Sequence, residues 1–428
     1  MIEKGMNRRE FIRTAAGTAA AAVAFPYVVP SSVLGAGAPS ERITIGFIAC
    51  GKQSKHLMRS FLNASGTQVV AACDVDKLKL ARGKGIVEDH YAQKGNGSYK
   101  GCDTYHDFRD VLARSDIDAV VISTPDHWHA FTTVEACRAG KDVYCEKPLT
   151  QTIEEARVMI DTVRRYNRIF QTGSMQRSSR EFRHACELVR NGYIGEIKHV
   201  TVSVGGPPAD KPLEPLPVPD YLDWDMWVGP AMWRPYHSEL SPHLSQDVFP
   251  HWRHHSYYGG GGMTDWGAHH FDIAQWGLGM DGTGPVEIYP PDGKDYKVLT
   301  YKYANGIPMT RDTAKGVLFE GTEGKVEVNR GYLKTWPDNI KDVVIGPDKT
   351  RLYNSRDHYA DWLDAIRKRT KPICDIEIGA SSVIVCHLGN IAYRLQRPLK
   401  WDPKREVFLG DDEANRLLSR PNRGPWYL

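Results

Sequence analysis

The sequence has few cysteines, little net charge and no internal repeat. Eight cysteines in 428 residues are too few for a disulfide scaffold, and no C-x-x-C pair is present. We therefore expect buried free thiols, for example at Cys50, Cys73, Cys137 and Cys145, which lie in or beside apolar runs. Lys and Arg total 55 and Asp and Glu total 52, so the net charge of +3 argues against a nucleic-acid partner. With 41% hydrophobic and 25% charged residues, the chain has a globular composition.

The first forty residues lack the long apolar run of a membrane span. Arg8 and Arg9 precede Phe11, and an uncharged, Ala-rich stretch follows over residues 14–29. A twin arginine before a short apolar stretch is typical of a Tat export signal. We expect residues 1–38 to be such a signal, or an arm that stays attached, with the protein exported to the periplasm and without a stable membrane anchor. An amphipathic helix with a chance arginine pair is the alternative.

Short apolar strands alternate with helices in the first half of the chain. This alternation predicts βαβ units and a Rossmann-type, doubly wound parallel sheet over residues 41–168. The expected strands are 42–48, 68–73, 118–123, 142–145 and 169–172, and the expected helices are 55–62, 76–91, 130–138 and 154–166.

The pattern changes after about residue 175. Strands at 198–204, 298–303 and 325–329 are longer and alternate apolar with polar residues, which indicates antiparallel pairing with one covered face. The Pro-rich stretch 207–219 cannot lie inside a sheet. Late helices are expected at 357–368 and 380–395. These features predict a C-terminal α+β domain over residues 169–428 with a large, mostly antiparallel sheet.

A possible dinucleotide-binding turn follows the first strand. The turn from Ala49 to Ser54 keeps only Gly51 of the G-x-G-x-x-G pattern, where the backbone could approach a pyrophosphate at a helix N-terminus. Asp74 ends the second strand, where a carboxylate binds ribose hydroxyls and repels a 2′-phosphate, so NAD is favoured over NADP. A plain βα turn and a capping aspartate remain the alternatives.

Two further motifs occur at strand and helix ends. Thr124-Pro125 with His129 follows one strand, and Glu146-Lys147-Pro148 follows the next. A glycine run at 259–262 leads into Asp265 and His269, the D-x-x-x-H spacing. Together with Trp252-Arg253, these motifs resemble the Gfo/Idh/MocA oxidoreductases over about residues 41–400. The departure is at Ala49 and Ser54, where the phosphate turn lacks two glycines.

The resemblance implies three catalytic residues. Lys147 would bond the reacting hydroxyl and aid proton transfer, His269 would be the base, and Asp265 would bind substrate hydroxyls. Lys147 ends a parallel strand, where ligands bind in doubly wound sheets. Asp265 and His269, four residues apart at an expected helix start, would share one face. A surface lysine paired with Glu146 and a structural histidine are the alternatives.

The cofactor-binding set combines the turn, the motifs and residues implied by the resemblance. It comprises Gly51, Lys52, Gln53, Asp74, Ser123, Thr124, Pro125, His129, Glu146, Lys147, Gln176, Trp252 and Arg253. The family generally needs no metal, and we expect none. The alternative is that His251 and His255 share a helical face as zinc ligands.

These observations predict an oxidoreductase that acts on a sugar or glycoside with tightly held NAD, since a diffusing cofactor would be lost after export. The resemblance implies two reactions that would regenerate the cofactor in place: coupled oxidation and reduction, or transient C3 oxidation that enables glycosidic cleavage. The alternating strands leave one face of the second sheet open, and the resemblance implies that this face packs against another subunit, so a homodimer or homotetramer with an apolar interface is expected. A non-catalytic NAD- and sugar-binding sensor, or a cytoplasmic dehydrogenase with freely exchanging NAD, are the alternatives.

Overall fold

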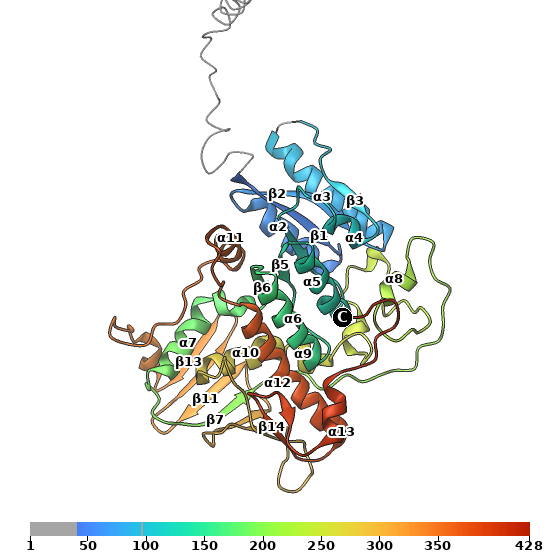
Figure 1. The fold of residues 1–428 in the computed structure, drawn as a ribbon. Helices are drawn as coiled ribbons and strands as arrows, with labels where there is room; N and C mark the ends of the chain where they lie inside the picture. Colours follow the sequence, from blue (N-terminus) through green and yellow to red (C-terminus); the bar gives the residue numbers. More distant parts are fainter. Residues whose placement is uncertain (1–40, 96) are drawn as a thin grey trace, which may run out of the picture. The chain divides into compact units, whose positions relative to one another are not determined.

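The computed structural model describes residues 41–95 and 97–428, so the expected export signal at 1–38 lies outside the described residues. Residues 43–428 form one compact unit. Within it, the described residues form two β-sheets, of six and nine strands (Figure 1).

The first sheet is parallel throughout, with the strand order β3-β2-β1-β4-β5-β6. This is the order of a dinucleotide-binding Rossmann fold, and it confirms the expected doubly wound sheet. Its strands are β1 Ile43–Ile48, β2 Thr67–Cys73, β3 Asp103–Tyr105, β4 Ala119–Ile122, β5 Asp142–Cys145 and β6 Phe170–Thr172.

Helices cover both faces of this sheet because β1, β4 and β5 are apolar on both sides and almost wholly buried. The helices of this half are α2 Lys52–Asn63, α3 Lys77–Gly95, α4 Phe108–Leu112, α5 His129–Arg138 and α6 Ile153–Arg165. A capping box fixes the start of α6, where the Thr152 hydroxyl accepts from the Glu155 amide. Helix α2 begins at Lys52, three residues before the expected start.

The second sheet has the order β13-β12-β11-β7-β10-β9-β8-β14-β15. Its pairs are antiparallel except β7 with β10, which confirms a mostly antiparallel sheet. The strands are β7 Ile197–Val202, β8 Glu287–Tyr289, β9 Thr300–Lys302, β10 Pro308–Arg311, β11 Val317–Gly321, β12 Lys325–Asn329, β13 Tyr332–Trp336, β14 Leu399–Asp402 and β15 Val407–Phe408.

The remaining helices belong to the second half of the chain. They are α7 Arg180–Arg190, α8 Trp224–Val228, α9 Gly261–Asp265, α10 Gly267–Leu278, α11 His358–Lys368, α12 Ile376–Leu395 and α13 Asp412–Asn415. Short 3-10 helices are η3 Asp126–Trp128, η4 Met175–Ser178, η5 Leu244–Gln246, η6 His251–His254, η7 Asp338–Asp342 and η8 Arg416–Leu418.

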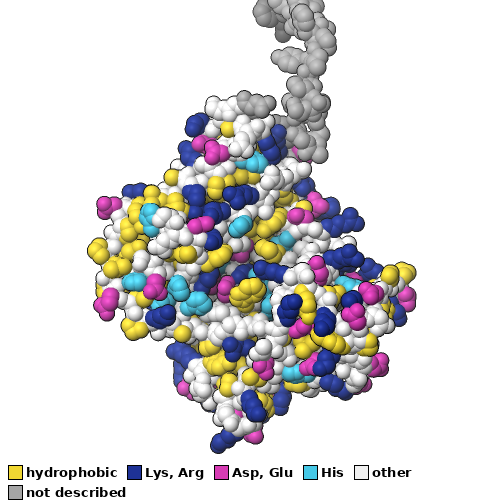
Figure 2. Space-filling model, turned by 180° about the vertical axis from the view of Figure 1, so that it is seen from behind, with side chains coloured by type: hydrophobic (Ala, Val, Ile, Leu, Met, Phe, Trp, Pro, Cys, Tyr) yellow, Lys and Arg dark blue, Asp and Glu magenta, His cyan; other side chains and the backbone are white. Residues whose placement is uncertain are grey.

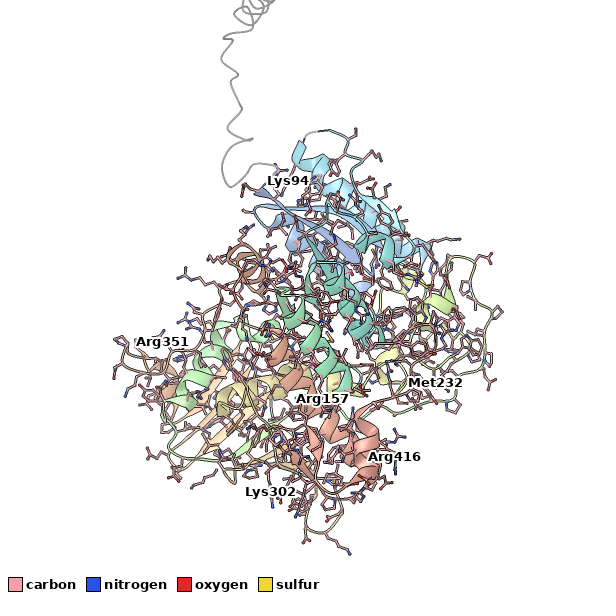
Figure 3. The ribbon with its side chains drawn as sticks, viewed as in Figure 1. Lys94, Arg157, Met232, Lys302, Arg351 and Arg416 are labelled. Atoms are coloured by element: carbon pink, nitrogen blue, oxygen red, sulfur yellow. The ribbon has the colours of Figure 1, made fainter. Side chains whose placement is uncertain are left out.

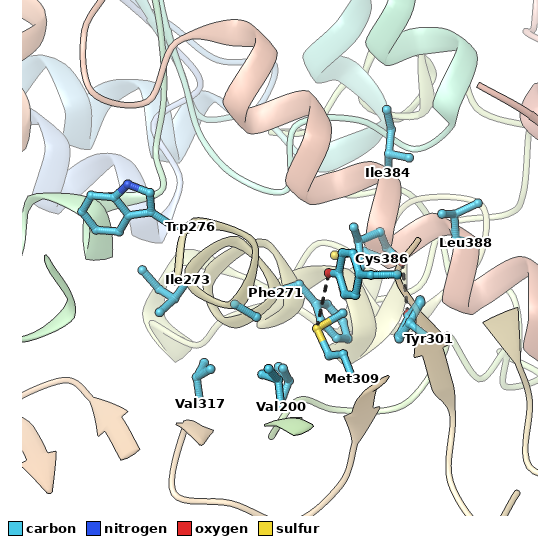
Figure 4. Close-up of a cluster of buried hydrophobic side chains, with 14 of the residues drawn as sticks. Val200, Phe271, Ile273, Trp276, Tyr301, Met309, Val317, Ile384, Cys386 and Leu388 are labelled. Carbon is cyan, nitrogen blue, oxygen red and sulfur yellow. Dashed lines mark hydrogen bonds between the residues drawn. The ribbon is translucent and has the colours of Figure 1, made fainter. Parts of the chain in front are cut away.

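The core of the second half lies between its sheet and helices α10 and α12. Figure 4 shows Phe271 and Ile273 of α10 beside Val200 and Val317 of the sheet, with Cys386 of α12 on the other side. Helix α12 is long and apolar enough to span a membrane, but 72% of its apolar window is buried inside the protein. This burial is typical of the core helix of a folded domain.

Two late helices also cover the first sheet. Trp362 and Leu363 of α11 join the buried cluster under β1 and β4, and Ile376 and Val383 of α12 join the cluster on the opposite face. The first sheet therefore depends for its burial on residues far along the chain. It also includes β6, which begins just beyond the expected boundary at residue 168.

The outer face of the second sheet is polar. His199 lies next to Glu320 (3.2 Å between Nδ1 and Oε2), and Glu320 accepts from the Lys325 ammonium. Lys302 lies 4.7 Å from the centre of the Tyr289 ring and is labelled at this sheet in Figure 3. Figure 2 shows charges of both signs interspersed over one face of the protein. The expected homo-oligomer, with its interface over this face, stays a prediction.

All eight cysteines are buried and unpaired, as expected for free thiols. Burial raises the pKa values of the Cys50, Cys73 and Cys145 thiols well above that of an exposed thiol.

A buried ion-pair network joins η4, α10 and α12. The Arg177 guanidinium donates from Nε to both Asp272 oxygens (3.0 and 2.8 Å) and from its other nitrogens to Asp281. The Ser382 hydroxyl also donates to Asp272, at 2.6 Å. Arg177 and Asp272 are 2% and 0% exposed, so neither charge is solvated by water.

Asp272→Asn should destabilise the fold by about 3 kcal/mol, because it leaves Arg177 buried with only the more exposed Asp281 as a counter-charge. The measurement is the midpoint of denaturant unfolding. Asp338→Ala is the control, since it removes an exposed pair with Lys341 and should leave the midpoint unchanged. Equal midpoints for Asp272→Asn and wild type would contradict the assigned role of the network.

Candidate active site

The turn between β1 and α2 keeps the geometry of a phosphate-binding loop without two of its glycines. Ala49 has a φ of 73°, the left-handed region that the first glycine would adopt. Ser54 is fully buried and donates to the Ala49 carbonyl. Gly51 is the N-cap of α2 with no side-chain cap, and a Cβ at Gly51 would meet nothing within 4 Å. The open helix N-terminus therefore fits a diphosphate.

Asp74 ends β2 beside this turn. Its carboxylate accepts from the Cys50 amide (2.7 Å) and the Asp76 amide (2.8 Å). Burial raises the pKa of Asp74, and the Lys79 ammonium opposes that shift. A carboxylate has about four lone-pair sites, so two remain for ribose hydroxyls. The turn and Asp74 together fit NAD.

A cavity of about 700 Å³ lies at the carboxyl ends of the parallel strands and is closed by residues of the second half. It brings together most of the residues expected from the sequence. The expected residues in its lining are Gly51, Lys52, Gln53, Asp74, Ser123, Thr124, Pro125, Glu146, Lys147, Trp252, Arg253, Asp265 and His269.

His129 and Gln176 lie behind this lining. His129 contacts the Pro148 carbonyl through Nδ1 (2.8 Å) and the Thr124 carbonyl through Nε2 (3.0 Å), so it joins the loops after β4 and β5. Burial lowers the pKa of His129 to about 4, so the ring is neutral and only one nitrogen donates. With its amide oriented to satisfy both neighbours, Gln176 donates to the His269 carbonyl and accepts from Arg330 Nε.

Lys147 and Asp265 form the ion pair at the centre of the cavity. Lys147 Nζ donates to Asp265 Oδ1 at 2.7 Å and to the Asp265 carbonyl at 2.8 Å. Arg253 Nε lies 3.9 Å from the same carboxylate. Burial would raise the pKa of Asp265, but the Lys147 and Arg253 cations lower it below its ordinary value. The pair therefore joins the loop after β5 to the end of α9.

Glu146 supports Lys147 from the first half. It is 5% exposed and accepts from Gln53 Nε2 at 3.1 Å and from the Lys147 amide at 3.3 Å. A Cβ at Gly173 would come within 3.0 Å of the Glu146 carboxylate. The buried carboxylate therefore needs glycine at this position. Glu146 is not the ion-pair partner of Lys147.

Asp265 and His269 both line the cavity, but not on one continuous helix. Helix α9 ends at Asp265 and α10 begins at Gly267, with a break at Trp266. His269 is 4% exposed, and no hydrogen-bond partner of its Nδ1 is present among the described residues. Burial, with the Lys147 and Arg330 cations, lowers the pKa of His269 well below 6.5. The imidazole is therefore neutral at neutral pH and suited to accept a proton.

His270 points elsewhere, with its Nδ1 donating to the Ser203 carbonyl at 2.8 Å. The alternative zinc site needs His251 and His255 on one helical face. They do not share one, because the 3-10 helix ends at His254 and His255 is extended. No group of three or more metal-ligating side chains occurs within residues 41–95 and 97–428. Trp224 and Trp227 stack on each other at 4.5 Å in a buried cluster, and of the two only Trp227 also lines the cavity.

Several cavity residues were not predicted from the sequence. Asp126 directly follows the Thr124-Pro125 motif, and that adjacency could have signalled it. Arg330 comes from the turn between β12 and β13, and Trp266 lies between two expected residues. Residues 240–250, called here the cover loop, close the nucleotide end of the cavity.

The cover loop is attached to the helices that follow β1 and β2. Lys55 Nζ lies 2.6 Å from Asp247 Oδ1, and Lys52 donates to the Asp247 carbonyl. Lys79 Nζ donates to the Ser241 hydroxyl at 3.1 Å. Three lysines of α2 and α3 thus hold a segment from the second half over the dinucleotide turn.

Comparison with known proteins gives matches over most of the chain. Residues 43–174 match the Gfo/Idh/MocA family described as "Oxidoreductase family, NAD-binding Rossmann fold". Residues 206–428 match its partner, "Oxidoreductase family, C-terminal alpha/beta domain". A glycosyl hydrolase family 109 protein of Shewanella sp. (strain ANA-3) is 33% identical over 208 residues, which is 46% of this chain and 45% of that relative. The match thus spans less than half of the relative's length.

Solved structures share the fold. The aldose-aldose oxidoreductase from Caulobacter crescentus has a TM-score of 0.57 at 18% identity, covering 84% of this chain and 99% of that one. The WlbA dehydrogenase from Bordetella pertussis, solved with NADH and UDP-GlcNAcA, has a TM-score of 0.57 at 17% identity, covering 84% and 98%. Because the two family profiles together cover both halves of the folded unit, the chain belongs to the Gfo/Idh/MocA oxidoreductase family and carries its NAD-binding Rossmann fold.

Proposed function

We propose that this protein oxidises a ring hydroxyl of a sugar or glycoside with NAD that stays bound through turnover. The observation that carries the proposal is the grouping of Lys147, Asp265 and a neutral His269 in one cavity with the dinucleotide turn. Bound NAD supplies a hydride acceptor next to these groups.

Proton transfer falls to the chain's own residues. An ammonium group has three N–H donors, and two of those of Lys147 are used by Asp265. The third is free to bond the oxygen of the reacting hydroxyl. His269 accepts the hydroxyl proton as the C–H electron pair leaves as hydride and a C=O bond forms. Asp265 keeps Lys147 in place and offers its second oxygen to a neighbouring hydroxyl.

The cover loop supports tight retention of NAD. It lies over the nucleotide end of the cavity and is attached through Lys52, Lys55 and Lys79. A cofactor beneath it would leave only after these contacts open. We propose retention together with export through the N-terminal segment, because a retained cofactor needs no supply outside the cytoplasm.

The relatives named as glycosyl hydrolases favour a redox-neutral outcome. Oxidation at C3 would acidify the C2 hydrogen, and loss of that proton would expel the group at C1. Water would then add at C1, and return of the hydride would restore the C3 hydroxyl. Product analysis with an aryl glycoside distinguishes this cleavage from net oxidation, because only cleavage releases the free phenol without accumulating a keto sugar.

Lys147→Ala and His269→Ala should each lower turnover by about 100-fold or more, the scale of a general acid–base contribution. Both variants should retain NAD. His270→Gln is the control, since His270 adjoins the base but bonds the Ser203 carbonyl and should leave turnover nearly unchanged. Loss of activity in His270→Gln with normal activity in His269→Ala would overturn the assignment.

The pH dependence of turnover should reflect the lowered pKa of His269. Because the pKa of His269 lies well below 6.5, its imidazole stays unprotonated as the pH falls from about 8 to about 6.5. The wild-type rate of the chemical step should therefore show no acid limb over this interval. A steep fall between these values, measured by single-turnover kinetics, would show that the base titrates at its ordinary pKa.

Asp74→Ser should raise the affinity for NADP relative to NAD by about tenfold or more, because it removes charge repulsion of the 2′-phosphate. Lys79 and Arg82, which line the same end of the cavity, would then attract the phosphate. Equilibrium binding of both cofactors to NAD-depleted protein is the measurement. A wild-type protein that binds NADP more tightly than NAD would contradict the role of Asp74 in selecting NAD.

Purified protein should carry NAD that is released only on denaturation. Asp247→Ala removes the pair with Lys55 and should speed NAD loss during dialysis by about two- to fivefold, the range of an exposed ion pair. Asp338→Ala, which removes an exposed pair that does not line the cavity, should not change NAD loss. A wild type that purifies without NAD and needs it added for each turnover would contradict retention.

A further inference from the structure

Arg330 carries a charge that the described residues do not neutralise. It follows the last residue of β12 and precedes Gly331, so the turn between β12 and β13 brings it into the wall of the active-site cavity. No carboxylate among the described residues lies within ion-pair distance of Arg330. Its contacts are the Gln176 amide oxygen, 3.3 Å from Nε, and the Trp266 ring, 5.1 Å from the guanidinium carbon.

The neighbouring cations of the cavity have partners. Lys147 is paired with Asp265 at 2.7 Å, and Arg253 lies 3.9 Å from the same carboxylate. Burial lowers the pKa of Arg330, and Asp265 and Glu146 act on it only from beyond contact distance. Arg330 is exposed to the solvent of the cavity, so its guanidinium stays protonated and is free to bind an anion there.

Trp266 lies beside Arg330 at the same wall. Its side chain is 42% exposed although it lines the cavity, and it separates Asp265 from His269 in sequence. An exposed indole face next to the proton-transfer groups suits the apolar face of a sugar ring. The wall therefore combines a flat aromatic surface with one uncompensated positive charge.

We propose that the substrate is an acidic sugar, whose negatively charged substituent is bound by Arg330 while its ring packs on Trp266. This inference rests on the proposed sugar oxidation at the same site. A carboxylate of a uronic acid or a sulfate ester shares the required chemistry, because both present oxygens that a planar guanidinium can bind in pairs.

The test compares matched neutral and acidic sugars on the NAD-loaded protein. Glucose is paired with glucuronate, galactose with galacturonate, and glucose with glucose 6-sulfate, each also as its methyl glycoside. The second-order rate constant for single-turnover reduction of the bound NAD takes the place of kcat/KM here, and calorimetry gives binding without turnover. The acidic partner should have a kcat/KM about 10- to 100-fold higher, the range of a charge-assisted hydrogen bond. Whether the uronate or the sulfate is preferred identifies the anionic group.

Arg330→Gln should abolish this preference by weakening the acidic sugars alone, and Arg330→Lys should restore part of it, because the charge returns without the planar fork. Trp266→Ala should weaken acidic and neutral sugars alike, since stacking does not depend on charge. The matched control is Arg416→Gln, an exposed arginine outside the cavity lining (Figure 3). Thermal melting checks that each variant is folded.

The outcomes separate this inference from the proposed function. Equal kcat/KM for neutral and acidic sugars, with no effect of Arg330→Gln, overturns the acidic-sugar inference while sugar oxidation stands. If no sugar reduces the bound NAD, the proposed function fails. Calorimetry then still decides the inference, because acidic sugars should bind wild type and not Arg330→Gln. Equal binding to the two proteins would overturn it.

Discussion

The ion pair between Lys147 and Asp265 is the contact on which the site depends. It joins the loop after β5 in the parallel sheet to the end of α9 in the second half. The same pair lowers the pKa of Asp265 and, through the Lys147 charge, helps to keep His269 neutral. This contact thus links the two halves at the site, favours the charged form of the Asp265 carboxylate and adds to the burial that keeps His269 unprotonated.

The parts of the fold that sequence reasoning predicted well are those set by local pattern. Strand β5 and the Glu146-Lys147-Pro148 turn lie where the apolar run and its end predict them, because burial on both faces leaves little freedom of register. Helix α2 begins earlier than its apolar pattern predicts, because a glycine N-cap and a polar first turn carry no apolar periodicity. The left-handed conformation of Ala49 could not be predicted either, because it goes with hydrogen bonds to residues distant in sequence, such as that from the Ala49 amide to the Cys73 carbonyl.

Residues brought in by long-range packing could not be predicted in this way. Arg330 is an ordinary turn residue until β11, β12 and β13 pair and aim their turn at the cavity. His129 was expected at the cofactor but lies behind the lining, where it joins two loops, and the sequence holds no sign of that difference. The cover loop shows the same limit, because its attachment to α2 and α3 spans more than 150 residues of chain.

The eight buried thiols have a consequence for the order of events in the life of the chain. Thiolate is the reactive form, so burial and raised pKa values protect these groups from oxidants and from one another once the fold is complete. An unfolded chain has no such protection, and eight exposed thiols allow many wrong pairings. The thiols are therefore best preserved when the chain folds under reducing conditions, and the finished structure then resists oxidants.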